Sequence, residues 1–398
     1  MNTPILRFSE FRDSWKKIKL NLVLETYINK NKDGKFQKND MLSVSSSAGV
    51  VNQMEYKGRS FAGESILPYN ILEQHQIVYT KSPLKEYPYG IIKFNEFYTG
   101  IVSTLYAVYN IKDGHSGKFI DYYFQLPERL NKYLKPLVNI GAKNDMKVNN
   151  DKVLTNTVVF PTHSEQNKIA SFLTAVDKKI QDLNKKKNLL EEYKKGVMQK
   201  ILSLELRFKD DQEKGFPKWQ YMNGNLIFET VTDKEHDSDL PILAITQEHG
   251  AIPRNLIEYN ISVTDKSIES YKVVQEGDFI ISLRSFQGGI EYSNYKGICS
   301  PAYIILRPFV DIDRKFFKYF FKTENYINTL NKTLEGIRDG KMISYKNFSE
   351  VKLPFPSKKE QTKIADFISS VDEKIKLSKV NIDKMETWKK GLLQKMFC

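Results

Sequence analysis

Cysteine is scarce in this sequence, and it has no long apolar segment. Of 398 residues only two are cysteines, Cys299 and Cys398, which excludes a disulfide framework and favours a reducing compartment. No apolar run approaches the ~20 residues that cross a bilayer, and the N-terminal segment MNTPILRFSEFRDSW lacks the uninterrupted apolar core of a secretory signal. We therefore expect a soluble, cytoplasmic protein without a membrane partner.

Motifs that carry chemistry are absent as well. No two glycines have the G-x-G spacing of dinucleotide or methyl-donor loops, and no GK[ST] phosphate-binding loop occurs. The Asn/Asp-Pro-Pro-aromatic motif of amino-methyltransferases and the Pro-Asp pair of restriction nucleases are also missing. The five histidines are scattered, and no Cys/His spacing resembles a zinc site. The sequence therefore predicts no catalytic residue and no metal site.

Positive charge is plentiful. Lysine and arginine total 61 against 48 acidic residues, which gives a formal net charge of +13 and a pI near 9.2. This excess indicates a polyanionic partner, either nucleic acid or an anionic membrane surface. The hydrophobic content of 40% is enough for the cores of the two or three domains that the length suggests.

An internal repeat organises the chain. The segment FPTHSEQNKIASFLTAVDKKI from Phe160 recurs as FPSKKEQTKIADFISSVDEKI from Phe355, and 18 of 41 aligned positions are identical without a gap. The segments Leu6-Arg7-Phe8 and Leu206-Arg207-Phe208 echo each other upstream of the two copies. The chain therefore consists of two copies of one unit, each a mixed domain followed by a long helix.

Each repeated segment has the signature of a helix. Thr162 and Ser357 stand three residues before Glu165 and Glu360, which is the spacing of a capping box. Apolar residues then follow at heptad spacing and predict a seam between two helices. The seam positions are Ile169, Leu173, Val176, Ile180 and Leu183 in the first copy and Ile364, Ile368, Val371, Ile375 and Ile382 in the second. We favour pairing of the helices as an antiparallel coiled coil; two amphipathic helices on separate domains are the alternative.

Short apolar runs between the helices predict strands, for example residues 242–246, 278–283 and 302–308. Helical stretches at 121–134 and 314–330 follow the strands of each domain. The expected fold class is α+β, with two mixed domains separated by two long helices in a pseudo-twofold internal repeat. The predicted segments are a first domain at 1–160, a central helix at 161–205, a second domain at 206–355 and a C-terminal helix at 356–398.

Candidate binding residues are those that can read base edges or hold phosphate. Forked Arg, Gln and Asn side chains match the major-groove edges of guanine and adenine, while Lys and hydroxyl groups suit phosphate. The candidates in the second domain are Arg284, Ser285, Gln287, Gln247, Arg254, Arg338 and Lys341, and those in the first are Ser45, Ser46, Lys57, Arg59, Lys81, Ser82 and Lys143. For each of them, an ordinary solvated surface residue is the alternative interpretation.

Taken together, these motifs resemble the specificity subunits of type I restriction–modification systems. The carrying motifs are the paired FP-x3-EQ-x-KIA-x-F, VD-x-KI and KKG-x2-QK, and the stretch GDFIISLRSFQGGIEYSNYKGICSPAY (277–303) resembles a target recognition domain. The first domain lacks an SLRSFQGG counterpart.

This resemblance implies that each domain binds one half of a bipartite site in double-stranded DNA. It implies that the paired helices set the gap between the halves and dock two methyltransferase subunits, which restriction or translocase subunits then join. The subunit itself would be non-catalytic and would bind no cofactor. S-adenosylmethionine for adenine-N6 methylation, together with ATP and Mg for cleavage, would belong to the partners.

The alternative is a non-enzymatic RNA- or DNA-binding scaffold with a coiled-coil interaction module. For such a protein, nucleic-acid binding would not depend on a fixed gap between two DNA half-sites.

Overall fold

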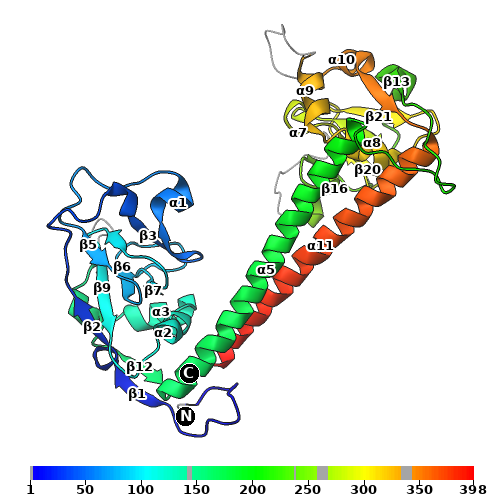
Figure 1. Cartoon of the computed structure of the whole chain (residues 1–398). Helices are drawn as coiled ribbons and strands as arrows, with labels where there is room; N and C mark the ends of the chain where they lie inside the picture. Colours follow the sequence, from blue (N-terminus) through cyan, green and yellow to red (C-terminus); the bar gives the residue numbers. More distant parts are fainter. Residues whose placement is uncertain (1–2, 141–145, 237–238, 258–267, 333–342) are drawn as a thin grey trace. The chain divides into compact units, whose positions relative to one another are not determined.

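The computed structural model describes residues 3–140, 146–236, 239–257, 268–332 and 343–398 (Figure 1). The chain divides into two compact units. Unit 1 contains Met1–Lys185 together with Val380–Cys398, and unit 2 contains Lys186–Lys379. Both units combine helices with antiparallel strands, so the predicted α+β class is confirmed. The four predicted segment boundaries stay predictions.

Two long helices contribute to both units: α5 (His163–Leu202) and α11 (Lys358–Lys395). In unit 1, the Asp177 carboxylate of α5 lies 2.6 Å from the Lys389 ammonium of α11. In unit 2, Asp372 of α11 lies 2.6 Å from Lys194 of α5. In each unit the early part of one helix contacts the late part of the other, so the paired segments run antiparallel. The two ion pairs occupy equivalent positions of the sequence repeat.

The predicted seam residues face inward in both helices. Ile169, Leu173 and Val176 are buried, as are Ile364, Ile368, Val371, Ile375 and Ile382, while Ile180 and Leu183 are half-buried. Aromatic rings pack beside the seam at equivalent places: Phe172 lies on Trp388 with ring centroids 6.1 Å apart, and Phe367 lies on Tyr193 at 6.5 Å. The knobs-into-holes packing of a coiled coil stays a prediction.

Unit 1 is built on a four-stranded antiparallel sheet in the order β2-β9-β6-β7. Its strands are β2 (Leu24–Tyr27), β9 (Tyr106–Ile111), β6 (Ile77–Thr80) and β7 (Ile92–Phe94). Two-stranded pairs surround it: β1 (Lys16–Lys19) with β12 (Thr157–Phe160), β3 (Leu42–Ser45) with β4 (Gly49–Asn52), β5 (Asn70–Leu72) with β8 (Gly100–Val102), and β10 (Asn139–Ile140) with β11 (Met146–Lys147). The short helices are α1 (Gln53–Lys57), α2 (Gly117–Tyr123), α3 (Pro127–Leu134) and α4 (Asn150–Val153), with 3₁₀ turns at Leu20–Leu22 and Lys38–Asp40.

Unit 2 repeats this framework. Its four-stranded sheet has the order β14-β21-β18-β19. The strands are β14 (Phe228–Val231), β21 (Ile304–Pro308), β18 (Phe279–Ile281) and β19 (Glu291–Tyr292). The accompanying pairs are β13 (Gln220–Asn223) with β22 (Lys352–Phe355), β15 (Leu243–Thr246) with β16 (Gly250–Pro253), and β17 (Lys272–Val274) with β20 (Gly297–Cys299). The helices are α7 (Ser285–Gly288), α8 (Arg314–Phe320), α9 (Glu324–Lys332) and α10 (Tyr345–Glu350), with 3₁₀ turns at Gly224–Leu226 and Arg254–Leu256. The three strands predicted in the second domain correspond to β15, β18 and β21.

The helical stretches predicted at 121–134 and 314–330 are each two helices, not one. In unit 1 the break falls between α2 and α3, because Pro127 has no N–H to continue the helical hydrogen bonds and suits the first turn of a new helix. In unit 2 the break falls between α8 and α9, where the Thr323 hydroxyl donates to the Phe320 carbonyl at 2.8 Å. That bond satisfies a carbonyl at the end of α8.

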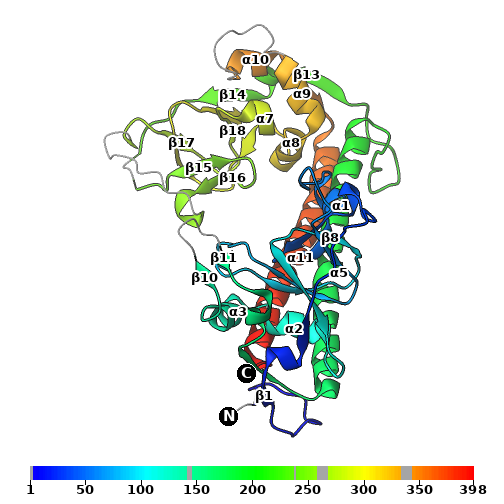
Figure 2. The same cartoon turned by 90° about the vertical axis from the view of Figure 1, so that its left-hand side faces the viewer.

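The long helices supply part of each hydrophobic core. In unit 1, Leu392 and Leu393 at the end of α11, with Met396 and Phe397 directly after it, are buried against Trp15, Phe119 and Phe160. Figure 2 shows α2 beside this end of α11, and the Phe119 and Phe397 rings lie 5.3 Å apart. In unit 2, Ile201 of α5 and Ile364 and Ile368 of α11 join the core around Phe228 and Phe316. Each domain therefore completes its core with helix residues.

The glutamates predicted to close the capping boxes have a different role. Ser357 accepts a hydrogen bond from the Glu360 amide at 3.4 Å, as a helix cap does, but the fully buried carboxylate of Glu360 binds Arg207 through two guanidinium nitrogens at 2.8–3.2 Å. In the same way, fully buried Glu165 binds Arg7 at 2.7 Å. The hydrogen bond to Glu165 raises the pKa of Arg7. Both carboxylates bind an arginine and do not cap the helix, because a buried charge needs a charged partner.

The glutamine that follows each glutamate ties the helix to its domain. The Gln166 side chain accepts from the Ser116 amide at 3.0 Å, and its own amide donates to the Pro161 carbonyl at 3.1 Å. Gln361 makes the equivalent bonds to Asp313 and Pro356, both at 2.9 Å. The repeated Glu-Gln dipeptide is therefore the joint between domain and helix in both units.

Buried polar pairs inside the domains, by contrast, differ between the units. In unit 2 the buried Asp278 carboxylate binds the Arg307 guanidinium at 2.7–2.8 Å, whereas the equivalent pair in unit 1 is neutral, Gln76 donating to Asn110 at 2.8 Å. At another position the charge of the strand residue is reversed: Lys93 of β7 pairs with Asp121, whereas Glu291 of β19 pairs with Lys322. The backbone framework thus persists with different side-chain chemistry.

Replacing Arg207 by alanine should destabilise the start of α11. Buried Glu360 would lose its counter-charge, which costs about 3 kcal/mol. Hydrogen exchange of the amides at residues 358–368 measures the free energy of local opening. Lys209→Ala, which removes an exposed ion pair with Glu213, is the matched control and should cost less than about 1 kcal/mol. Equal effects of the two substitutions would contradict a structural role for the buried pair.

Candidate nucleic-acid interface

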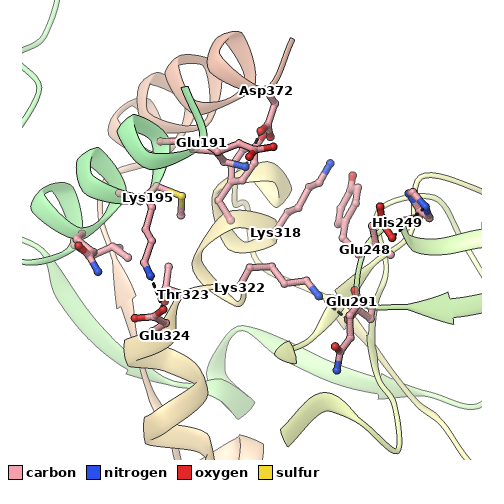
Figure 3. Close-up of a pocket in the computed structure, with 18 of the residues that line it drawn as sticks. Glu191, Lys195, Glu248, His249, Glu291, Lys318, Lys322, Thr323, Glu324 and Asp372 are labelled. Carbon is pink, nitrogen blue, oxygen red and sulfur yellow. Dashed lines mark hydrogen bonds and ion pairs between the residues drawn. The ribbon is translucent and has the colours of Figure 1, made fainter. Parts of the chain in front are cut away.

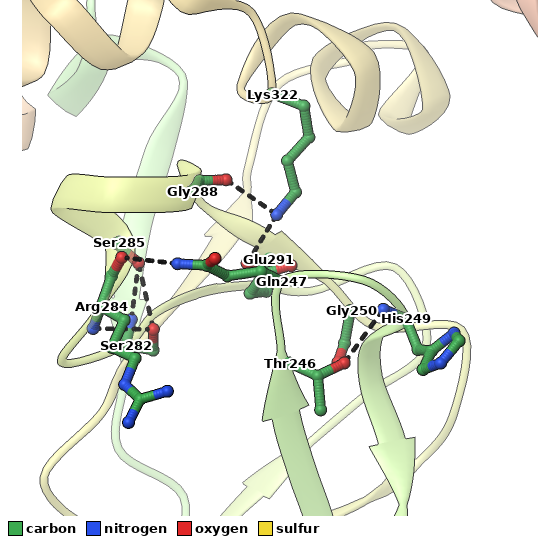
Figure 4. Close-up of polar contacts among 10 residues, drawn as sticks. All are labelled: Thr246, Gln247, His249, Gly250, Ser282, Arg284, Ser285, Gly288, Glu291 and Lys322. Atoms are coloured by element: carbon green, nitrogen blue, oxygen red, sulfur yellow. Dashed lines mark hydrogen bonds and ion pairs between the residues drawn. The ribbon is translucent and has the colours of Figure 1, made fainter. Parts of the chain in front are cut away.

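Two segments of unit 2 that are distant in sequence form one exposed cluster. The turn of the β15–β16 hairpin carries Gln247, and α7 begins directly after Arg284. The Gln247 amide donates to the Arg284 carbonyl at 3.4 Å (Figure 4). Gly288 makes this approach possible, because a Cβ there would lie only 2.6 Å from Gln247 Cδ. The predicted residues Arg284, Gln287 and Gln247 therefore lie on neighbouring segments, all three exposed.

Serine hydroxyl groups stabilise the turn that carries Arg284. Ser285 is only 1% exposed, and its hydroxyl accepts from the Ser282 amide at 2.8 Å. The Ser282 hydroxyl accepts from the Arg284 amide at 3.2 Å. On the other side, the Lys322 ammonium donates to the Gly288 carbonyl at 2.9 Å. Ser285, predicted as a contact residue, therefore positions the turn that presents Arg284.

Arg254 is not brought to this cluster. It begins the 3₁₀ turn after β16, and its amide donates to the Ile242 carbonyl at 3.0 Å, beside the start of β15. The hairpin turn with Gln247 is at the opposite end of the same two strands, which are four residues long. Three further predicted residues, Arg338, Lys341 and Lys143, lie outside the described residues.

The predicted residues of unit 1 are distributed over three places. Ser45 and Ser46 lie at the turn of the β3–β4 hairpin, where the Ser45 hydroxyl accepts from the amides of Ser47 and Ala48. Lys57 and Arg59 are exposed, and both cations lie over the Phe61 ring, at 5.1 and 4.8 Å from its centroid. Lys81 and Ser82 follow β6, and the Lys81 ammonium donates to Asn150 at 2.7 Å.

Burial lowers the pKa of Lys81. Held by Asn150, this lysine is less available to an outside partner than the exposed pair Lys57 and Arg59, which with Phe61 form a basic and aromatic surface.

Unit 2 has a cleft next to the Gln247–Arg284 cluster that could not be predicted from the sequence. Its volume is about 610 Å³, and it lies between α5, the α8–α9 segment, β19 and the β15–β16 turn (Figure 3). Among its lining residues are Lys318, Lys322 and Glu291. The Lys322 ammonium lies 2.5 Å from the buried Glu291 carboxylate, whose pKa is raised by burial. No motif marks these residues, because they come from separate elements.

Comparison with known proteins finds similarity to one family. The family model described as Type I restriction modification DNA specificity domain matches residues 221–387. A protein of Methanocaldococcus jannaschii named as the MjaX specificity subunit of a type I restriction enzyme is 25% identical over 63% of this chain and 61% of its own length. The MjaVIII specificity subunit of the same organism is 24% identical over 59% and 60%. The chain is therefore similar to the specificity subunits of type I restriction–modification systems. It covers about 60% of the length of these curated relatives.

Solved structures show that the fold extends over the whole chain. The S subunit of a type I restriction–modification system from M. genitalium superposes with a TM-score of 0.54 at 14% identity, covering 100% of this chain and 99% of that one. A chain from a study of complex assembly and conformational transition in the type I system gives 0.54 at 15% identity, covering 96% and 97%. The specificity-subunit fold predicted from the repeat is thereby confirmed.

No helix in the described ranges is both long and apolar enough to cross a membrane. No three His, Cys, Asp or Glu side chains of the described residues gather in a way that could hold a metal ion.

Placing a methyl group at Gly288 should displace Gln247 without unfolding the domain. In Gly288→Ala the new Cβ meets the end of the Gln247 side chain, which can rotate away and give up its bond to Arg284. We expect the free energy of unfolding to change by less than about 1 kcal/mol, and preferential DNA binding to weaken by about 10-fold or more, the value of one lost base contact.

Gly215→Ala is the control, since no atom lies within 4 Å of its added Cβ. Retained DNA preference in Gly288→Ala would show that Gln247 does not read bases.

Proposed function

We propose that this specificity subunit is the non-catalytic DNA-reading component of a type I restriction–modification complex, with each domain binding one half of a bipartite site in double-stranded DNA. One observation carries the proposal. The two units share a strand framework, yet they carry unlike residues at the same exposed places. The β15–β16 turn presents Gln247, Glu248 and His249, whereas the equivalent β3–β4 turn presents Ser46, Ser47 and Ala48.

The side chains at these places suit base reading. The guanidinium of Arg284 matches the two acceptors on the major-groove edge of guanine, and the amides of Gln247 and Gln287 match the donor and acceptor of adenine. Exposed Lys57 and Arg59 of unit 1 suit phosphate contacts, which fix the position of a protein on DNA. The net charge of +13 favours DNA over a neutral partner.

We further propose that α5 and α11 dock two methyltransferase subunits, which restriction or translocase subunits then join. In unit 2, Leu189 and Leu377 are 55% and 60% exposed, and Tyr193 is 51% exposed. Exposed apolar side chains on paired helices suit a protein partner. In this proposal S-adenosylmethionine, ATP and Mg bind to the partners, adenine-N6 methylation and DNA cleavage take place there, and the complex works in the cytoplasm.

Arg284→Ala tests base reading. Loss of a bidentate arginine–guanine contact removes roughly 1–3 kcal/mol of discrimination, so cognate binding should weaken by about 10- to 100-fold. The measurement is a titration of the methyltransferase complex against cognate DNA and every single-base variant, at two salt concentrations. Preference should disappear at one or two positions of a single half-site.

Arg12→Ala, which removes an exposed arginine of unit 1, is the control and should leave the preference intact. Uniform weakening across all variants would instead assign Arg284 to the phosphate backbone.

Exchanging one domain tests the independence of the two readers. Residues 209–354 should be replaced by those of a related subunit, with Arg207 and Gln361 retained because they join domain to helix. We expect the mapped methylation site to change in one half only, while the methyltransferase still co-purifies. A change in both halves, in a chain that folds normally, is the result that counts against two independent domains.

A further inference from the structure

The cleft of unit 2 contains four lysines, and three of them have an acidic partner. Lys194 pairs with Asp372 at 2.6 Å, Lys195 with Glu324 at 2.6 Å, and Lys322 with Glu291 at 2.5 Å. Among the described residues, the fourth, Lys318 of α8, has neither an ion pair nor a hydrogen bond to its ammonium group. Among the described residues, Lys318 is therefore the lysine of this cleft whose charge is not paired.

Lys318 is half-buried, and the described residues around it do not neutralise its charge with an ion pair. Its ammonium lies over the rings of Tyr292 and Tyr319, 5.2 and 5.8 Å from their centroids. Burial, with Lys194 and Lys315 nearby, lowers the pKa of Lys318, whereas Asp372 opposes this shift. In Figure 3 its side chain extends from α8 into the space between α5 and the β15–β16 turn. A partly desolvated cation that faces an open cleft favours an incoming anion.

The cleft is continuous with the proposed base-reading cluster. Gln247 lines the cleft and also donates to Arg284. Lys322 lines the cleft and also donates to Gly288, next to Gln287. DNA held against Arg284 and Gln247 therefore passes the mouth of the cleft, and the anion that DNA carries at regular spacing is the backbone phosphodiester. The volume of about 610 Å³ leaves room for a phosphodiester with its flanking sugars.

We infer that the cleft of unit 2 is a phosphate-binding site, in which Lys318 holds one backbone phosphodiester of the half-site read by this domain. The inference rests on the proposed DNA-reading function and adds a positioning residue to it. A phosphate contact fixes the register of the domain on the duplex and carries no base information. The contact therefore has a signature that differs from that of Arg284.

The first experiment measures DNA affinity against salt concentration, for the wild-type methyltransferase complex and for Lys318→Met. Removing one phosphate contact should lower the slope of log affinity against log salt by about 0.9 and weaken binding at 0.1 M salt by about eightfold, equally for cognate and unrelated DNA. Lys318→Arg keeps the charge and should keep the slope. Lys315→Met is the matched control, because it removes an exposed lysine of the same helix that does not line the cleft.

The second experiment locates the contact. Single phosphodiesters of the cognate site are replaced by neutral methylphosphonates. One replacement in one half-site should weaken wild-type binding and have no further effect on Lys318→Met.

Three outcomes for Lys318→Met would overturn the inference. The first is an unchanged salt slope, and the second is a loss of preference at a single base pair. The third is a loss of co-purification with the methyltransferase, which would make the cleft a protein-docking site. If the wild-type complex showed no preference for cognate DNA, the proposed function itself would be wrong. Failure of the phosphate-site inference and failure of the proposed function are therefore distinguishable.

Discussion

The buried ion pair at the start of each long helix is the constraint on which the rest of the molecule depends. Glu165 and Glu360 are fully buried, so each must keep its arginine or lose far more than one hydrogen bond. Arg7 and Arg207 belong to the repeated Leu-Arg-Phe segments, and these segments therefore lie against the helices in both units. The phenylalanines of these segments also contact the helices: Phe8 packs against Phe172, and Phe208 packs against Phe367. The Glu-Gln joint and the long helix are similar in the two units, whereas the domain surfaces differ.

Divergence in the domains extends below the surface. An ion pair in one unit is a neutral amide pair in the other, and the strand residue of a second ion pair changes sign, while strand order and register persist. The backbone hydrogen bonds of antiparallel strands do not depend on which side chains they carry. Such a scaffold can therefore present different groups at the same turn, Gln247 in one domain and serines in the other, without changing how the domain is attached to its helix.

The sequence predicted what local pattern and repetition specify, and it missed what depends on distant contacts. The two helices and their seam followed from heptad spacing, and the resemblance to specificity subunits followed from two ordered copies of short motifs. The Glu-Gln dipeptide looked like a helix cap, because nothing local reveals that Arg7 or Arg207 reaches the carboxylate. The proximity of Gln247 and Arg284 depends on strand pairing over nearly forty residues. Lys318 was missed for the same reason, since only the assembled cleft shows that no acidic side chain of the described residues forms an ion pair with it.

The composition of unit 1 imposes an order of events during synthesis. Unit 2 is continuous in sequence, so all residues of its core leave the ribosome together. Unit 1 needs Leu392, Leu393, Met396 and Phe397 around Trp15 and Phe119, and these arrive only after the whole of unit 2 has been made. At about 5–20 residues per second the first domain waits roughly 10–40 s with an open apolar face. The domain translated first is therefore the one that completes its core last.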